Sequence, residues 1–290
     1  MPDSSPAPRP APTPPPVAKT YKLFIGGSFP RSESGRSYPV RRPDGSLVAN
    51  VARASRKDLR DAVKAATGAQ SAWAGRTAYN RGQILYRVAE VLEGRRAQFV
   101  DELVAIGVPG DEAAAEVEAT VDAWVWYAGW ADKYPMVLGT VNPVAGPYFD
   151  FTVPEPTGVV GIFSPRRPAL LGLVERLAPV IVSGNTAVVV VPDDAGPVAV
   201  DLAEVLATSD LPGGVVDILT GFPDELAPWM LGHRGVNAVD LTGAGELAPE
   251  LVAEAAVNVK RVVRGHPGAR GPEVIADFVE YKTVWHPIGR

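Results

Sequence analysis

Five short apolar runs recur along the second half of the chain, and segments with helical character separate them. The runs cover residues 159–164, 186–191, 215–220, 237–242 and 259–264. Continuous apolar strands that alternate with helices are typical of a parallel sheet that is covered on both faces. Their spacing of about 20–30 residues suits right-handed βαβ crossovers. The pattern therefore predicts an α/β protein whose core, residues 157–270, is a doubly wound, Rossmann-like parallel sheet.

The first half of the chain, residues 19–139, has mainly helical patterns. Ser55, with Asp58 three residues later, is a capping signature, and apolar residues at helical spacing follow it. Amphipathic patterns continue over residues 81–105 and 111–134. We expect helices that pack their apolar faces against the sheet.

Two features of this part are open to more than one interpretation. Residues 21–40 contain two β-prone runs around a Gly/Ser-rich turn, which predicts a hairpin. Trp124 and Tyr127 lie in the second of the amphipathic segments. They could form a binding platform, but packing in the core is the favoured interpretation.

The remaining segments differ in composition from the core. Residues 1–18 are rich in proline and poor in large apolar side chains, which predicts a disordered arm. Residues 140–156 alternate in polarity and predict an exposed hairpin. A strand over 275–286, within the last segment 271–290, is its expected companion, and together they carry more aromatic surface than a solvated monomer favours.

Composition narrows the class of protein. The net charge of −5 gives no basic surface for nucleic acid. No apolar run approaches the length of a membrane span, and no signal-peptide core opens the chain. The sequence has no cysteine, and its three histidines do not stand at metal-ligand spacing. These observations predict a cytoplasmic protein without a metal and without a membrane or nucleic-acid partner.

Several segments also occur in the order and spacing of the aldehyde dehydrogenase family. They include PTGVVGIFSP, LAPVIVSGNTAVVVVP, LPGGVVDILTG and VDLTG in the predicted sheet, KLFIGGSF and RGQILYRVAEVLE before it, and FVEYKTVWHPIG at the end. The resemblance implies a coenzyme-binding core over 157–270, with 19–139 as its N-terminal helical part. It implies a small β oligomerisation arm made of 140–156 and 271–290.

Enzymes of this family use a cysteine nucleophile, an asparagine amide that holds the oxyanion, and a glutamate base. The resemblance places a tryptophan and that asparagine at Arg166 and Arg167, and it places the glutamate near Gly265, where none stands. His266 is interpreted as a surface residue rather than a substitute base. The family's large catalytic domain has no counterpart before the C-terminal segment. We therefore expect no catalytic residue in this chain.

The positions that hold the coenzyme in the family are also changed. Val191 stands in place of a ribose-binding lysine, and the acidic residue that follows is matched by Asp194, whose alternative role is a helix N-cap. The segment LTGAGELA offers amides at a helix start, but Ala244 replaces a serine and Glu246 would repel a pyrophosphate. Arg166 and Arg167 could hold an anion, although solvated or partner-facing arginines are the favoured interpretation.

Together these substitutions predict that no cofactor is bound, with NAD or NADP binding as the alternative. The vestigial coenzyme-binding residues are Ser164, Pro165, Asp194, Thr242, Gly243 and Ala244.

The function predicted from the sequence is that of a catalytically inactive, aldehyde-dehydrogenase-like subunit. It would stabilise or regulate a full-length aldehyde dehydrogenase in a hetero-oligomer, through the hairpin 140–156 and the tail 275–286. Two alternatives stay open. One is an NAD(P)-dependent oxidoreductase with altered chemistry, and the other is a nucleotide-binding sensor without catalysis.

Overall fold

The computed structural model describes residues 19–245, 249–265 and 268–289. The Pro-rich segment 1–18, which the sequence predicts to be disordered, lies outside the described residues, as do Glu246 and His266. No described helix is long and apolar enough to cross a membrane.

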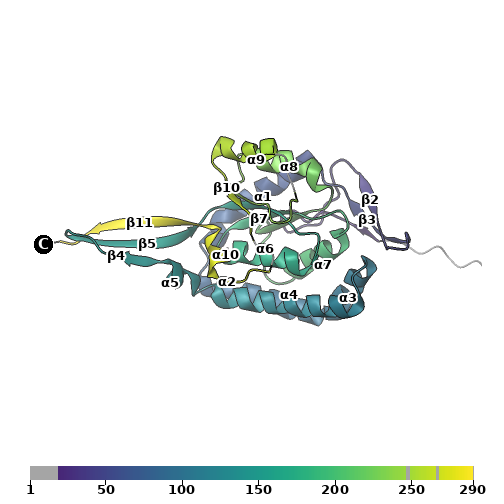
Figure 1. The fold of residues 1–290 in the computed structure, drawn as a ribbon, viewed down its shortest axis with the longest axis horizontal. Coiled ribbons are helices and arrows are strands. Elements are labelled where there is room, and N and C mark those ends of the chain that lie inside the picture. The colour runs from purple at the N-terminus through teal and green to yellow at the C-terminus, as the bar shows by residue number, and fades with distance from the viewer. Residues whose placement is uncertain (1–18, 246–248, 266–267, 290) are drawn as a thin grey trace, which may run out of the picture.

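A parallel sheet of five strands forms the centre of the molecule (Figure 1). Its strands lie in the order β10-β9-β6-β7-β8. Their bounds are Val159–Phe163 (β6), Thr186–Val190 (β7), Val216–Leu219 (β8), Ala238–Asp240 (β9) and Arg261–Val263 (β10). Each strand falls within one of the five apolar runs of the sequence. The prediction of a doubly wound, Rossmann-like α/β fold is therefore confirmed.

Helices cover both faces of this sheet (Figure 1). One face carries α1 (Arg56–Ala74) and α8 (Pro223–Gly232), with α9 (Pro249–Glu254) and a short 3-10 turn (Ala255–Asn258) beside α8. The other face carries α6 (Leu171–Val182) and α7 (Gly196–Ala207). A second layer packs on α6 and α7 and consists of α2 (Ala78–Gly94), α3 (Arg96–Ala105) and α4 (Gly110–Trp130).

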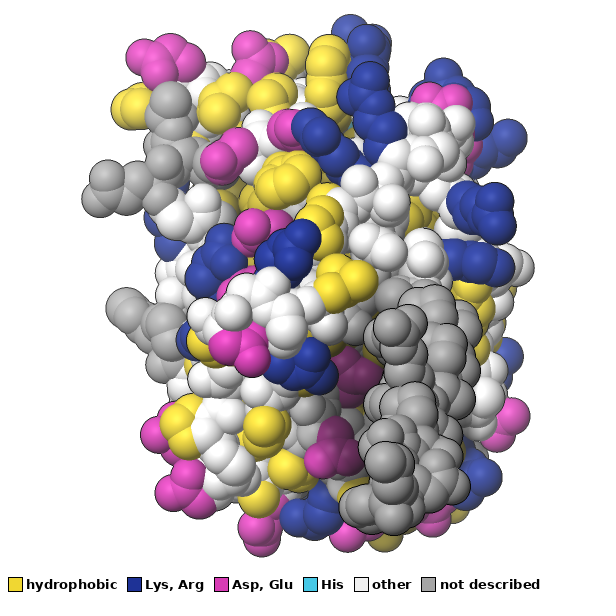
Figure 2. Space-filling model, turned by 90° about the vertical axis from the view of Figure 1, so that its right-hand side faces the viewer, with side chains coloured by type: hydrophobic (Ala, Val, Ile, Leu, Met, Phe, Trp, Pro, Cys, Tyr) yellow, Lys and Arg dark blue, Asp and Glu magenta, His cyan; other side chains and the backbone are white. Residues whose placement is uncertain are grey.

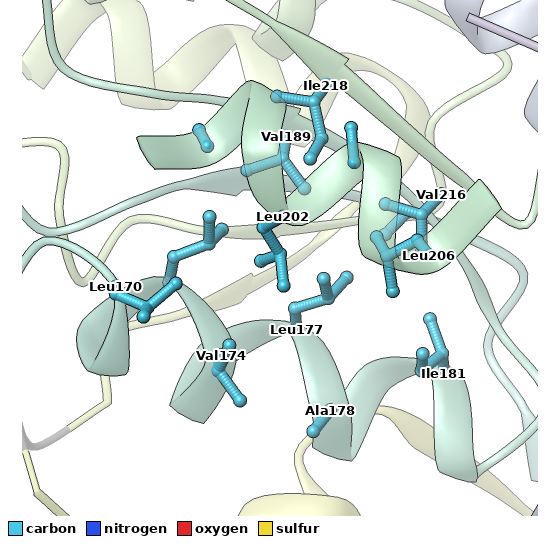
Figure 3. Packing of buried hydrophobic residues seen from close by; sticks show 14 of the residues in the cluster. Leu170, Val174, Leu177, Ala178, Ile181, Val189, Leu202, Leu206, Val216 and Ile218 are labelled. Atoms are coloured by element: carbon cyan, nitrogen blue, oxygen red, sulfur yellow. The ribbon is translucent and has the colours of Figure 1, made fainter. Parts of the chain in front are cut away.

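The largest apolar cluster lies between the sheet and α6 and α7 (Figure 3). Leu177 of α6 and Leu202 of α7 point toward each other beneath the strands, and Val189 of β7 lies above them. All three side chains are fully buried. Strands β6 to β8 are buried on both faces, and this burial explains why their sequences consist mainly of apolar residues.

The N-terminal part confirms some predictions and corrects others. Ser55 and Asp58 form the predicted capping box at the start of α1, and Trp124 and Tyr127 are fully buried in the core. The hairpin expected within 21–40 is wrong in position. Residues 25–28 form only a tight turn, and the hairpin consists of β2 and β3, which share a small sheet with β1. These strands span Thr20–Tyr21 (β1), Ser37–Arg41 (β2) and Leu47–Ala52 (β3).

The helix expected over 81–105 is interrupted at one residue. Arg95 leaves helical backbone geometry, with φ −110° and ψ 13°, and separates α2 from α3. Its guanidinium donates to Glu204 of α7 at 2.7 Å. Both α2 and α3 pack against α7, on either side of this break.

A three-stranded antiparallel sheet extends away from the body and forms the arm (Figure 1). It contains β4 (Thr140–Asn142), β5 (Tyr148–Pro156) and β11 (Val279–Pro287), which α5 (Tyr134–Leu138) and α10 (Pro272–Ala276) connect to the body. β11 pairs with β5 over nine residue positions. Trp285 is 58% exposed and lies against Tyr148, with ring centroids 5.9 Å apart. The aromatic side chains of the arm are thus exposed, as the sequence indicated.

A buried carboxylate lies in the middle of β8. Asp217 is fully buried, and one of its oxygens accepts a hydrogen bond from the Gly26 amide at 2.6 Å. The other oxygen has no partner within the described residues. Burial raises the pKa of Asp217 to about 7, since few groups compensate the charged form.

This carboxylate makes stability depend on pH. The folded protein keeps a proton on Asp217 up to about pH 7, whereas the unfolded chain releases it near the ordinary aspartate pKa of 3.8. Raising the pH between these values therefore favours unfolding, by at most about 1.4 kcal/mol per pH unit. We predict that Asp217→Asn removes this decline, because asparagine still accepts from Gly26 but never ionises. Urea unfolding at pH 5 and pH 8 measures the effect.

The matched control is Asp61→Asn on the exposed surface of α1, where Asp61 pairs with Lys57. The stability gained by Asp217→Asn over the wild type should be larger at pH 8 than at pH 5, and Asp61→Asn should show no such change. An equal effect of Asp217→Asn at both pH values would contradict a proton held on Asp217.

Candidate functional site

The sheet has a topological switch point between β6 and β9. From β6 the chain moves outward through β7 and β8, and it then returns to place β9 on the other side of β6. Open parallel sheets bind ligands in the crevice outside the carboxyl ends of the strands at such a point. β5 of the arm leads directly into β6, so the carboxyl ends lie at the end of the molecule away from the arm (Figure 1).

The structure brings the predicted residues after β6 and after β9 into contact at this point. Ser164 and Pro165 follow β6, and Thr242, Gly243 and Ala244 lie in the turn after β9. The amide of Gly243 donates to the Phe163 carbonyl at 3.1 Å. A Cβ on Gly243 would lie 2.2 Å from the carbonyl carbon of Ser164. Only glycine therefore permits this close approach of the two turns.

The amides of the β9 turn are used within the protein itself. The Thr242 amide donates to Asp240 at 2.9 Å, and the Ala244 amide donates to the Leu241 carbonyl at 3.0 Å. The Thr242 hydroxyl accepts a hydrogen bond from the Gly265 amide at 2.9 Å. A hydroxyl that accepts one bond still has its proton to donate. The phosphate-binding amides that the sequence suggested are thus engaged at residues 242–244.

Asp194 lies beside the switch point but does not cap a helix. The residue at the N-cap of α7 is Ala195, and no side chain caps that helix. Asp194 instead pairs with Arg166 at 2.8 Å and with Arg167 at 3.0 Å, and Arg166 also donates to Asp193 at 2.7 Å. The N-cap alternative for Asp194 is therefore wrong. Both arginines are exposed to solvent, as the favoured interpretation expected, and both also pair with aspartates of the same chain.

These four residues form an ion cluster that joins the carboxyl ends of β6 and β7. We call Arg166, Arg167, Asp193 and Asp194 the edge cluster. The aspartates raise the pKa of Arg166, chiefly through the hydrogen bond from its guanidinium to Asp193. Viewed from the end opposite the arm, the surface shows basic and acidic side chains interspersed, without a single large basic patch (Figure 2). The carboxyl edge is close to electrically balanced.

The start of α6 is capped by a residue that sequence reasoning missed. α6 has no side-chain cap of its own, but Glu116 of α4 reaches its first turn. One oxygen of Glu116 accepts from the amides of Leu170 and Leu171, at 2.6 and 3.2 Å. A carboxylate at this position favours the helix dipole and satisfies unpaired donors. Only long-range packing brings α4 and α6 together, so no local pattern identifies this cap.

A second missed element is a buried ion pair below the β9 turn. Arg176 of α6 donates to Asp240 of β9 at 2.6 Å, and their side chains are 3% and 0% exposed. The other oxygen of Asp240 accepts from the Thr242 amide. The pair therefore fixes α6 to β9 and orients the turn that carries the candidate residues. Val191, at the position of the family's lysine, is also fully buried and offers no polar group.

No group of three or more metal-binding side chains occurs among residues 19–245, 249–265 and 268–289. The chemistry available at the site thus comes from hydroxyl, guanidinium and carboxylate groups.

The profile of the "Aldehyde dehydrogenase family" matches residues 29–284. The chain belongs to the aldehyde dehydrogenase family. It is 35% identical over 266 residues to retinal dehydrogenase 2 of Gallus gallus, which covers 89% of this chain and 50% of that protein. It is 30% identical over 262 residues to "Aldehyde dehydrogenase, cytosolic 1" of Elephantulus edwardii, which covers 88% and 51%.

The fold is likewise that of solved aldehyde dehydrogenases. The structure of the NAD+ complex of aldehyde dehydrogenase from Bacillus cereus superposes with a TM-score of 0.78 at 26% sequence identity, and it covers 84% of this chain and 50% of that one. This aldehyde dehydrogenase family chain thus spans about half the length of the relatives it matches.

These comparisons correct one prediction. The expectation that no cofactor is bound is contradicted, because the family and the structure of its NAD+ complex point to NAD(P) as the cofactor. Val191 and Ala244 change single side chains, whereas the fold that surrounds them superposes on the solved enzyme with a TM-score of 0.78.

The buried pair yields a stability prediction. Asp240→Ala leaves Arg176 charged and buried without its counter-ion, which should lower the free energy of unfolding by about 3–5 kcal/mol. Urea denaturation measures this loss. The control is Glu155→Ala, which breaks the exposed pair with Lys282 and should cost under about 1 kcal/mol. Equal losses in the two variants would show that the Arg176 pair is no more important than a surface contact.

Proposed function

We propose that this chain is a non-catalytic member of the aldehyde dehydrogenase family that binds a nicotinamide dinucleotide and assembles with a full-length aldehyde dehydrogenase. The observation that carries the proposal is the edge cluster. Arg167, at the position where the resemblance places the oxyanion asparagine, is bound to Asp194 and to the Ile106 carbonyl. That corner holds an internal ion cluster instead of a free amide donor.

The absence of a nucleophile supports the non-catalytic part of the proposal. The family's aldehyde chemistry forms a covalent intermediate on a cysteine thiolate, and this chain has no cysteine. Ser164 does not take its place. Its side chain is almost fully buried, and its hydroxyl donates to the Pro165 carbonyl at 3.4 Å. No base that could activate it lies within hydrogen-bond distance among the described residues.

The residues of the switch point fit a dinucleotide through their backbone shape and a few side chains. The close contact between Gly243 and Ser164 lies between the turns after β6 and β9, where folds of this type bind dinucleotides. The Thr242 hydroxyl belongs to the second of these turns, and the Arg166 guanidinium extends from the first to the aspartates after β7. When bound, the nicotinamide ring would supply a hydride acceptor. Within this chain, the role of these residues is to bind and orient the dinucleotide.

The arm supports an assembly role. β11 lies at the edge of its sheet, and edge strands present backbone groups that can pair with another strand. Tyr281 and Trp285 on this strand are more than half exposed. A strand that adds to an exposed edge gains main-chain hydrogen bonds and buries such aromatic side chains. We propose that a full-length aldehyde dehydrogenase provides this strand, with contacts to both 140–156 and 275–286.

Dinucleotide binding and the lack of turnover can be tested with the purified chain. We expect NAD+ or NADP+ to raise the melting temperature in a saturable way, because a ligand that binds only the folded state stabilises it. We expect no reduction of either dinucleotide with a panel of aldehydes. Turnover by the purified chain would contradict the non-catalytic assignment, and flat titrations with both dinucleotides would contradict the binding.

Assembly is tested by co-purification from the native host, followed by light scattering on the purified pair. The expected partner is a full-length aldehyde dehydrogenase. Trp285→Ser should weaken the complex by about tenfold or more, because exposed tryptophans that become buried dominate interface energies. The control is Trp229→Ser on α8, which has a comparable exposed fraction outside the arm. Equal weakening by both variants, or no association with any full-length family enzyme, would contradict the role of the arm.

A further inference from the structure

We propose that Arg166 binds a phosphate group of the dinucleotide and that Asp193 is the counter-ion it releases on binding. This inference rests on the proposed dinucleotide binding at the switch point. It assigns a ligand-binding role to a residue that stands where the resemblance places a tryptophan, so the role is particular to this chain.

A dinucleotide brings a negatively charged pyrophosphate to the carboxyl edge. In folds of this type such a group is met by backbone amides of a glycine turn or by the N-terminus of a helix. The amides of Thr242, Gly243 and Ala244 already donate to acceptors of the protein itself. Releasing them would break the contact that joins the turns after β6 and β9. The described turn therefore has no spare amide at these three positions.

The N-terminus of α6, which follows β6, is also occupied. Glu116 accepts from the amides of both Leu170 and Leu171, so a carboxylate already holds the position that an anion would take. Glu116 is buried, and displacing it would leave a negative charge without its donors. A phosphate is thus repelled from this helix end, and a cation on the same edge is the better partner for it.

Two other candidates at the edge are unsuitable. Val191 is fully buried and apolar. Arg167 is fixed by three acceptors, namely the carbonyls of Arg166 and Ile106, at 2.7 and 3.2 Å, and the carboxylate of Asp194, at 3.0 Å. Because its guanidinium ties the end of α3 to the loop after β7, its movement would cost several contacts at once.

Arg166 is held much more loosely. Its described partners are the carboxylates of Asp193 and Asp194, at 2.7 and 2.8 Å. The side chain of Arg166 is 58% exposed, and that of Asp193 is 39% exposed. Exposed ion pairs contribute little to stability, so the exchange of Asp193 for a phosphate costs little. A guanidinium also matches phosphate oxygens with two parallel hydrogen bonds.

The test is isothermal titration calorimetry of the full chain with NAD+ and with NADP+. Arg166→Gln should weaken binding about tenfold, the loss expected for a charge-assisted hydrogen bond. Asp193→Asn should tighten binding by about threefold, because Arg166 then has one competing anion fewer. Circular dichroism confirms that both variants, which change exposed residues, remain folded.

The matched control is Glu225→Gln, which removes the partner of Arg53 from another exposed ion pair. It changes the net charge by the same amount as Asp193→Asn. Its dissociation constant should stay within about twofold of the wild type, since solvent screens charges that do not contact the ligand. An effect equal to that of Asp193→Asn would mean that net charge alone changes affinity, and this would overturn the proposal.

The two dinucleotides identify which phosphate Arg166 contacts. Equal weakening of NAD+ and NADP+ by Arg166→Gln supports contact with the shared pyrophosphate. Weakening confined to NADP+ supports contact with its 2′-phosphate. Unchanged affinity of Arg166→Gln for both dinucleotides overturns the role of Arg166 but leaves the proposed dinucleotide binding intact. A wild-type chain that binds neither dinucleotide overturns the proposed function together with this inference.

Discussion

The contact between Gly243 and the Ser164–Pro165 peptide is the constraint on which the site depends. It holds the turn after β9 against the turn after β6, and even one additional carbon atom on residue 243 would clash with the backbone. The surrounding elements converge on it. α6 begins just beyond Pro165, and the Arg176–Asp240 pair holds the base of the opposite turn. The switch point is thus a rigid, closely packed structure even where its family side chains have changed.

Charges at this edge divide into two classes by burial. The Arg176–Asp240 pair is almost completely enclosed, and breaking such a pair costs several kcal/mol, so it serves to position the turn. The side chains of the edge cluster are 31–58% exposed, and each of its ion pairs contributes little to stability. Because these ion pairs stabilise the protein only slightly, a charged ligand can replace one of their partners at little cost. The same edge therefore combines a fixed scaffold with a guanidinium that can change partners.

The sequence was sufficient to predict the strands of the central sheet, since β6 to β10 depend on apolar runs that any parallel sheet requires. The capping box at Ser55 was also predictable, because its two residues, Ser55 and Asp58, lie three positions apart in the sequence. Glu116 and the Arg176–Asp240 pair were not predictable, because their partners lie 54 and 64 residues away in the chain. The break at Arg95 was not predicted either, and the partner of its side chain, Glu204 of α7, lies 109 residues away. The family resemblance identified Asp194 as a candidate residue, but its pairing with Arg166 and Arg167 became clear only from the fold.

The most direct test of a dinucleotide site at the β6/β9 switch point is a crystal structure of the chain with NAD+ or NADP+ bound. We predict that the dinucleotide lies across the turns at Ser164 and Gly243, with a phosphate oxygen within hydrogen-bond distance of the Arg166 guanidinium and Asp193 released from it. A dinucleotide bound elsewhere, or one bound at the switch point while Arg166 remains on Asp193, would contradict this prediction.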